Sequence, residues 1–122
     1  MAREFLVAVI DDDDPFRTAL VESLASLGFR ARGFASAEAF VAANAQDGCD
    51  CVISDIQMPG MSGLDLKRLL DDRGSSVPVI MITGRPEPEL EARAAASGAI
   101  CLLRKPFDSN AMIGCLEKAL RI

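Results

Sequence analysis

The sequence predicts a single α/β domain in which five parallel strands alternate with five helices. Short apolar runs alternate five times with segments in which apolar residues recur at helical spacing. The runs are near-continuous, as in parallel strands that are buried on both faces. The 122 residues are enough for one domain with a hydrophobic core and too few for two. Strict alternation gives right-handed crossovers, which place helices on both faces of the sheet.

Each element is predicted from its local pattern and its flanking residues. Strands are assigned to apolar runs bounded by turn residues, and helices to segments with apolar residues every three or four positions. Chain length and strand number favour the flavodoxin-like strand order 2-1-3-4-5 over a barrel, which needs eight such units. In chain order we expect strands at 5–10, 30–34, 52–55, 77–82 and 100–103, and helices at 15–27, from 37, at 64–70, at 87–97 and from about 109.

The first two strand–helix units have clear boundary signals. Pro15 suits the first turn of a helix, so Asp14 is expected to cap the first helix and Gly28 to end it. The second strand, residues 30–34, is short and charged, which is typical of an edge strand. Ser36 is expected to cap the second helix.

The last three units follow the same logic. The third strand ends at Asp55 and enters a turn rich in Pro and Gly, and Gly74 ends the helix after it. Pro78 lies near the beginning of the fourth strand, where a missing N–H is tolerated. The fourth helix is rich in alanine and the least apolar, so we expect it to pack most loosely. Asp108 or Ser109 is expected to cap the last helix.

The composition excludes several classes of function. Half of the residues are hydrophobic and a quarter are charged, and the net charge of -5 argues against nucleic-acid binding by this domain. No apolar run approaches about 20 residues and no signal-peptide pattern is present, so we expect no membrane span. The absence of histidine excludes histidine acid–base catalysis. Cys51 and Cys101 are expected to be small buried hydrophobes, and the cysteine pattern indicates a cytoplasmic location.

Polar residues suited to phosphoryl chemistry follow four of the five predicted strands. Asp11 and Asp12 follow the first strand, Asp55 ends the third, Thr83 ends the fourth, and Lys105 comes after the fifth. Because the carboxyl ends of parallel strands lie at one edge of the sheet, we expect these side chains to meet in one crevice.

Three carboxylates in one crevice repel one another, and a divalent cation with oxygen ligands removes this conflict. Hard oxygen ligands and few protein groups describe a Mg²⁺ site. A carboxylate can accept phosphate as an acyl phosphate, while an ammonium and a hydroxyl bind phosphoryl oxygens. The set indicates phosphoryl transfer to Asp55, catalysed by positioning and charge neutralisation.

Each of these residues alone has an ordinary explanation. Residues 11–14 could be a solvated acidic helix start favoured by the helix dipole, Thr83 a turn residue, and Lys105 a surface lysine. Their convergence on one sheet edge favours the site instead. Asp13 and Asp14 keep the ordinary role of dipole and cap residues.

Four separated motifs carry a resemblance to a known family. On the strength of these motifs, the chain resembles a response-regulator receiver domain of two-component signalling. The resemblance covers essentially all of residues 1–122. The chain is most similar to the nitrogen-fixation type, which usually carries a C-terminal helix-turn-helix output domain. The motifs are Ile10-Asp11-Asp12-Asp13, Asp55-Ile56-Gln57-Met58-Pro59-Gly60-Met61-Ser62-Gly63, Ile82-Thr83-Gly84 and Lys105-Pro106-Phe107.

The resemblance implies the phosphoacceptor and the metal ligands. Asp55 would accept the phosphoryl group from the phosphohistidine of a sensor histidine kinase. Asp12, Asp55 and the backbone carbonyl of Gln57 would bind Mg²⁺, and Asp11 would act mainly through a bound water. Metal-dependent phosphorylation of one carboxylate is therefore the expected chemistry.

The resemblance also assigns roles around the acceptor. Thr83 and Lys105 would bind the phosphoryl oxygens, and the Lys105–Pro106 peptide would be cis, which the small trans preference of X-Pro bonds allows. Gln57 and Arg85 flank the site and are candidates for tuning hydrolysis of the phosphoryl group.

As a whole, the resemblance implies a phosphorylation-activated switch rather than an enzyme. The domain would assist its own phosphorylation and slow dephosphorylation, then change the face formed by the fourth helix, fifth strand and fifth helix. Expected partners are a sensor histidine kinase, a second copy on phosphorylation, and a DNA-binding output domain beyond Ile122. Leu102 departs from the family, which usually has Tyr or Phe there, so the usual coupling between Thr83 and that face is in doubt.

Two other functions compete with the switch. A Mg²⁺-dependent phosphohydrolase with an aspartyl nucleophile would use a similar acid cluster, but the chain has no room for the cap of the known phosphatases. An interaction module that works without phosphorylation is the other alternative. The complete set of site residues argues against it.

Overall fold

Five parallel strands form one sheet in the order β2-β1-β3-β4-β5, which confirms the predicted order. The computed structural model describes residues 4–85 and 87–122; residues 1–3 and Pro86, which belongs to the predicted turn after the fourth strand, lie outside this description. In the centre of the sheet, Val9 pairs with Ile53, and Ile53 pairs with Ile80. The strands are β1 (Leu6–Ile10), β2 (Arg30–Phe34), β3 (Cys51–Asp55), β4 (Val79–Thr83) and β5 (Cys101–Arg104).

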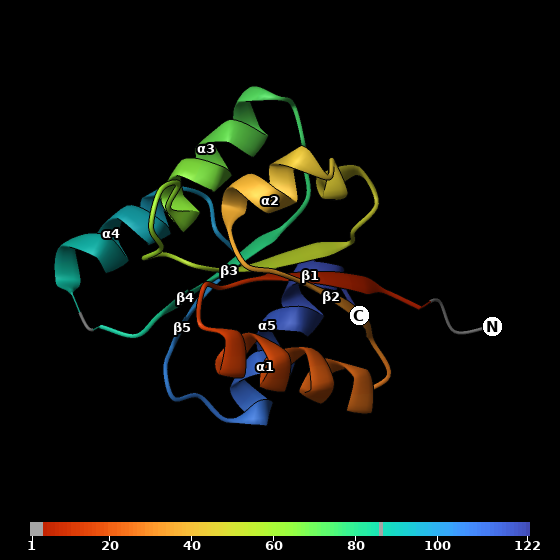
Figure 1. Ribbon diagram of the computed structural model, residues 1–122. Coiled ribbons are helices and arrows are strands. Elements are labelled where there is room, and N and C mark those ends of the chain that lie inside the picture. The colour runs from red at the N-terminus through yellow and green to blue at the C-terminus, as the bar shows by residue number, and fades with distance from the viewer. Residues whose placement is uncertain (1–3, 86) are drawn as a thin grey trace.

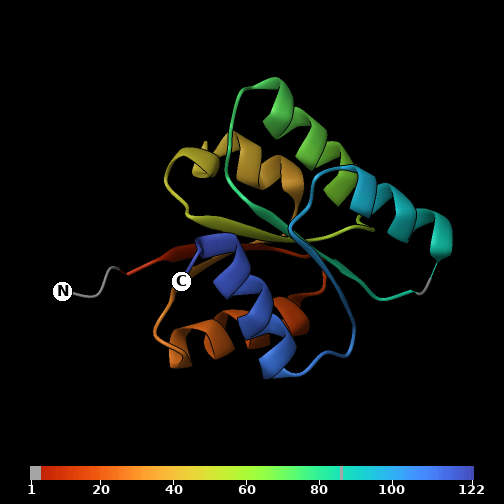
Figure 2. The same ribbon diagram turned by 180° about the vertical axis from the view of Figure 1, so that it is seen from behind.

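Helices cover both faces of the sheet, as predicted. Figures 1 and 2 show α1 and α5 on one face and α2, α3 and α4 on the other. A short 3-10 helix (Ala45–Asp47), which was not predicted, follows α2. The helices are α1 (Asp14–Ser26), α2 (Ala37–Ala42), α3 (Gly63–Asp72), α4 (Pro88–Ala96) and α5 (Ser109–Leu120).

The sheet separates two hydrophobic clusters. Leu24 of α1, Ile53 and Leu116 of α5 belong to the cluster on one face. Phe40 of α2 and Leu66 of α3 belong to the cluster on the other. Each helix therefore buries its apolar stripe against one face of a sheet whose own residues alternate between the two clusters.

The first helix begins one residue earlier than predicted. Asp13, not Asp14, is the cap: its carboxylate accepts a hydrogen bond from the Phe16 amide, at 3.2 Å. Asp14 is the first helical residue and Pro15 the second, because proline is tolerated anywhere in the first turn, where amides lack helical partners. Asp108 caps α5, as one of the two predicted options.

The cysteines are mostly packing residues. Cys51 is fully buried, and burial raises the pKa of its thiol to about 12. The prediction that Cys101 is buried is wrong. This residue is partly exposed to solvent, because it lies on the edge strand β5. Among the residues described, no helix combines the length and hydropathy that a membrane span requires.

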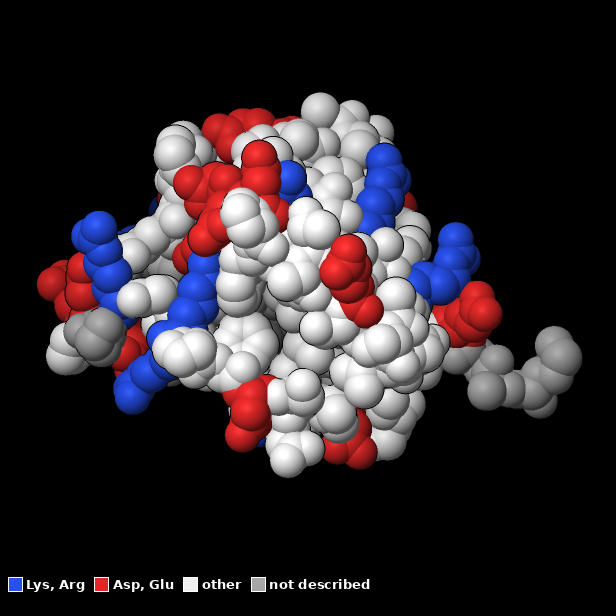
Figure 3. All heavy atoms as spheres, turned by 60° about the horizontal axis from the view of Figure 1, so that its bottom comes forward, with Lys and Arg blue, Asp and Glu red and all other residues white. Residues whose placement is uncertain are grey.

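The surface over α1 and α5 carries few charges. Figure 3 shows a broad uncharged area on this side of the molecule, with acidic groups around it. Several exposed residues of both helices are small, including Ala19, Ala25, Ala111 and Gly114.

Candidate phosphoacceptor site

The carboxyl edge of the sheet brings together most of the predicted site residues. Asp11 follows β1 and is fully buried, and Asp55 ends β3 with 7% of its surface exposed. Lys105, in the loop after β5, bridges them: its Nζ lies 2.9 Å from Asp11 Oδ2 and 3.2 Å from Asp55 Oδ2. Side chains from three separate strand ends therefore meet at one point, as the alternation of strands and helices predicts.

Asp12 completes an acidic cluster with Asp11 and Asp55. One carboxylate oxygen from each of the three lies within 4.8 Å of the others, and Asp12 is exposed while the other two are buried. The amide of Gln57 donates to Asp55 Oδ1 at 3.1 Å, which holds the start of the β3–α3 loop against this carboxylate. Three converging hard oxygen donors, one of them open to solvent, fit a small divalent cation such as Mg²⁺.

The pKa of Asp55 and the pKa of Lys105 are both raised, for different reasons. Burial raises the pKa of Asp55, and the charge of Asp11 raises it further, although Lys105 acts against both. Burial alone would lower the pKa of Lys105, but its hydrogen bond to Asp11 and the charges of both carboxylates outweigh burial and raise it. At neutral pH the ammonium is therefore charged and compensates the buried acids.

Thr83 lies at the end of β4 but does not point its hydroxyl at the acids. This hydroxyl donates to the carbonyl of Arg85 at 2.7 Å and accepts from the Arg85 amide at 3.2 Å. Thr83 is almost fully buried. The predicted phosphoryl ligand is thus at the predicted sheet edge, with its hydroxyl engaged in the β4–α4 loop.

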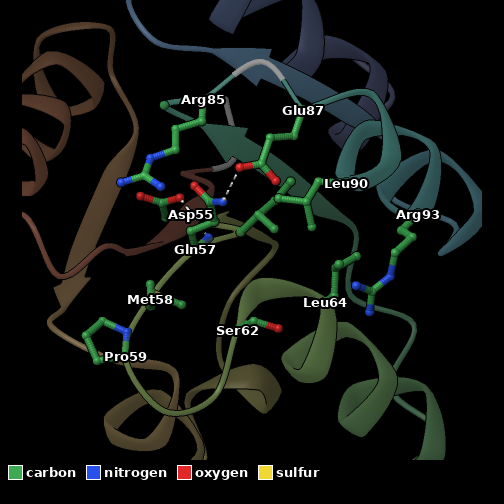
Figure 4. A pocket seen from close by; sticks show the side chains of 12 residues that line it. Asp55, Gln57, Met58, Pro59, Ser62, Leu64, Arg85, Glu87, Leu90 and Arg93 are labelled. Carbon is green, nitrogen blue, oxygen red and sulfur yellow. Dashed lines mark hydrogen bonds between the residues drawn. The ribbon is translucent and has the colours of Figure 1, made fainter.

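A pocket of about 740 Å³ opens beside Asp55. Figure 4 shows Arg85 and Glu87 on one side of it, from the β4–α4 loop, and Met58, Pro59 and Ser62 on the other, from the β3–α3 loop. The side-chain amide of Gln57 donates to Glu87 across the pocket at 3.5 Å, the long limit of a hydrogen bond. Gln57 and Arg85, predicted to flank the site, both line this pocket.

Two contacts around the site were not predicted from the sequence. The guanidinium of Arg17 donates to the carbonyl of Asp11 at 2.7 Å, and the Arg17 stem lies over Gly33, where a Cβ would come within 3.2 Å. The carboxylate of Glu38 accepts from the Met61 amide at 3.0 Å. Arg17 thus fixes the loop after β1, which carries Asp11, and Glu38 fixes the loop that follows Asp55.

Leu102 is partly buried on β5 and packs into the cluster under α4. A hollow of about 320 Å³ lies beside it. The other residues that line the hollow are mostly small: Glu91, Ala94, Ala95, Ala99, Ile100 and Cys101. The Lys105–Pro106 peptide is cis, as predicted.

The raised pKa of Asp55 has a consequence for stability. An acid whose pKa is higher in the folded than in the unfolded protein makes the fold less stable as pH rises. We expect Asp55→Asn to raise the free energy of unfolding at pH 7 in Mg²⁺-free buffer, with a smaller gain near pH 4, where Asp55 of the unfolded chain is itself partly protonated. Urea unfolding at both pH values measures this, and a variant less stable than the wild type at pH 7 would contradict it.

Comparison with known protein families identifies one that matches nearly the whole chain. The family described as "Response regulator receiver domain" matches residues 7–117. The chain is 36% identical over 120 residues to the response regulator protein TmoT of Ectopseudomonas mendocina and 38% identical over 120 residues to the transcriptional regulatory protein FixJ of Azorhizobium caulinodans. These alignments cover 98% of the chain but only 54% of TmoT and 57% of FixJ, so the chain spans about half of each relative.

Solved structures show the same similarity. The crystal structure of FixJ-N superposes with a TM-score of 0.89 at 32% identity and covers 98% of this chain and 96% of that one. The response regulator StyR superposes with a TM-score of 0.88 at 33% identity and covers 98% of this chain and 60% of that one. The strand order and the helices on both faces are therefore those of a fold already known in experimental structures.

Proposed function

Because the chain belongs to the response regulator receiver domain family, we propose that residues 1–122 form a signalling switch that is phosphorylated on Asp55. The observation that carries this proposal is the position of Lys105, whose ammonium bridges Asp11 and Asp55, the second of which lines an open pocket. A charged carboxylate beside a fixed cation suits transfer of an anionic group, since the cation compensates the charge that arrives.

We assign Mg²⁺ to the acidic cluster. Asp12, Asp55 and the backbone carbonyl of Gln57 would bind it, with Asp11 acting mainly through a water molecule. The open side of the cluster at Asp12 leaves room for the several waters that Mg²⁺ keeps. When bound, the ion supplies positive charge that allows a carboxylate and a phosphoryl group to approach each other.

The residues of the chain then divide the work of phosphoryl transfer. A carboxylate oxygen of Asp55 forms the new bond to phosphorus while the phosphorus–nitrogen bond to the donor's imidazole breaks. Lys105 stabilises a phosphoryl oxygen as a point charge. Thr83 donates its hydroxyl to a second oxygen, for which it must leave the carbonyl of Arg85. Gln57 and Arg85, at the pocket rim, tune attack by water on the acyl phosphate.

Thr83 also provides the signal. When its hydroxyl leaves the Arg85 carbonyl, the β4–α4 loop loses the contact that fixes its start, and α4 can shift. The surface of α4, β5 and α5 then changes its affinity for a partner. Leu102 replaces the usual aromatic on this surface, and the hollow beside it leaves room for a change of its rotamer.

The proposed partners follow from the family. The phosphodonor is a sensor histidine kinase, and the receiver controls an output domain or partner, for which a DNA-binding domain beyond Ile122 and a second phosphorylated copy are the candidates. Because its net charge is -5, the domain itself binds no nucleic acid. It acts in the cytoplasm.

Labelling with a small phosphodonor tests the proposal. In Mg²⁺ buffer the wild type is expected to gain the mass of one phosphoryl group, and Asp55→Asn to gain none. Asp13→Asn is the matched control, since Asp13 caps α1 and should label normally. Equal labelling of Asp55→Asn and wild type would overturn the assignment, and multiple turnover of a generic phosphomonoester would indicate a phosphohydrolase instead.

A further inference from the structure

The ammonium of Lys105 has a third neighbour besides its two carboxylates. Its Nζ lies 4.1 Å from the centre of the Phe16 ring, within the range of a cation–π contact. About 20% of the Lys105 side chain is exposed to solvent. The Phe16 ring covers part of the ammonium surface that Asp11 and Asp55 do not contact. A flexible lysine stem is thus confined by Asp11, Asp55 and an aromatic face.

Phe16 is held in place from two sides. Its amide donates to the carboxylate of Asp13, which fixes it in the first turn of α1. Its ring packs edge-on against Phe107, with centroids 6.0 Å apart and an interplanar angle of 81°. Because Phe107 comes from the same loop as Lys105, the aromatic pair ties the beginning of α1 to the loop that carries the lysine.

An aromatic face suits a lysine that must serve two arrangements. Hydrogen bonds to Asp11 and Asp55 have fixed directions, whereas attraction to the ring depends mainly on the distance to its face. When the charge on Asp55 moves outward onto a phosphoryl group, the ammonium can follow it across the ring without losing this contact. A lysine whose ammonium was surrounded only by water would lack this ring contact. It would lose more rotamer freedom when it binds the phosphoryl oxygen.

We propose that Phe16 is a positioning residue that holds Lys105 over Asp55 and guides it to the phosphoryl oxygen. This inference rests on the proposed function of Lys105 and goes beyond it, because it assigns the orientation of the lysine to a residue of α1. The sequence shows Phe16 only as an apolar residue at the start of a helix.

Three variants separate the aromatic face from packing. Phe16→Leu removes the face but keeps apolar bulk, Phe16→Tyr keeps the face, and Phe107→Leu removes the ring that touches Phe16 while leaving Lys105 its own contact. The first readout is the NMR shift of the Lys105 ε-methylene protons, which the ring moves upfield. The second is the rate of labelling by a small phosphodonor in saturating Mg²⁺.

Phe16→Leu is expected to abolish the upfield shift and to slow labelling about five-fold, and Phe16→Tyr to retain both near wild-type values. Phe107→Leu keeps the ring beside Lys105 but loses one of the contacts that hold this ring, so it should slow labelling less than Phe16→Leu does. Labelling of Phe16→Leu at the wild-type rate, or equal losses in all three variants, would overturn the inference. Absence of labelling in the wild type would instead refute the proposed function, while the upfield shift would still report the ring contact.

Discussion

Replacement of Lys105 by methionine is expected to slow phosphorylation of Asp55 by about 100-fold, the usual cost of losing one group that stabilises developing charge. Methionine keeps most of the length of the side chain but removes the ammonium, which lies 3.2 Å from Asp55 Oδ2. The rate of labelling by a small phosphodonor in saturating Mg²⁺ measures the effect. Metal binding should persist, because the carboxylates remain, and Mg²⁺ titration by thermal unfolding checks this.

Lys118→Met provides the control for loss of a lysine as such. Lys118 lies exposed in the last turn of α5, and this variant should label at the wild-type rate. If Lys105→Met also labelled at the wild-type rate with intact Mg²⁺ binding, the ammonium would have no part in phosphoryl transfer. Its contacts with Asp11 and Asp55 would then serve stability alone.

Gly63→Ala is expected to destabilise the fold by about 2–3 kcal/mol and to disturb the site at the same time. A Cβ at Gly63 would lie 2.5 Å from the carbonyl oxygen of Asp55 and 3.1 Å from the Cα of Ile56. Both neighbours are backbone atoms at the end of β3, so either the start of α3 or Asp55 must move. Urea unfolding measures the stability, and labelling measures the damage at Asp55.

Gly114→Ala is the opposite case on the same chain. Gly114 is exposed in α5, and a Cβ there would meet nothing within 4 Å. Alanine should stabilise the helix by about 0.5–1 kcal/mol through its higher propensity, with unchanged labelling. Equal stability changes in the two variants would show that close approach to the Asp55 backbone is not what requires glycine at position 63.

The parts of the structure that were predicted correctly depend on local pattern. Apolar runs, helical spacing and turn residues are readable along the chain. Their strict alternation predicts a parallel sheet, and chain length and strand number favour the order that the structure shows. The convergence of Asp11, Asp55 and Lys105 then follows, because each stands at the end of a strand or directly after it. The wrong prediction that Asp14 caps α1 was an error of one residue. Proline can occupy either of the first two helical positions, so Pro15 does not fix the position of the cap.

The contacts that were missed join segments far apart in the sequence. Glu38 reaches Met61, and Phe16 reaches Lys105, through distances that only the packed structure sets. An exposed glutamate on a helix and a phenylalanine in an apolar stripe each have a common explanation that needs no partner. The turned-away hydroxyl of Thr83 was beyond prediction for a related reason, because its rotamer depends on the Arg85 backbone.

The two hydrophobic clusters, separated by the sheet, have an evolutionary consequence. Mutations in one cluster touch the other only through strand backbone, so their effects on stability should add. The layer of α1 and α5 can therefore diverge independently of the layer of α2, α3 and α4. Chimeras that exchange one whole layer between relatives should therefore remain folded.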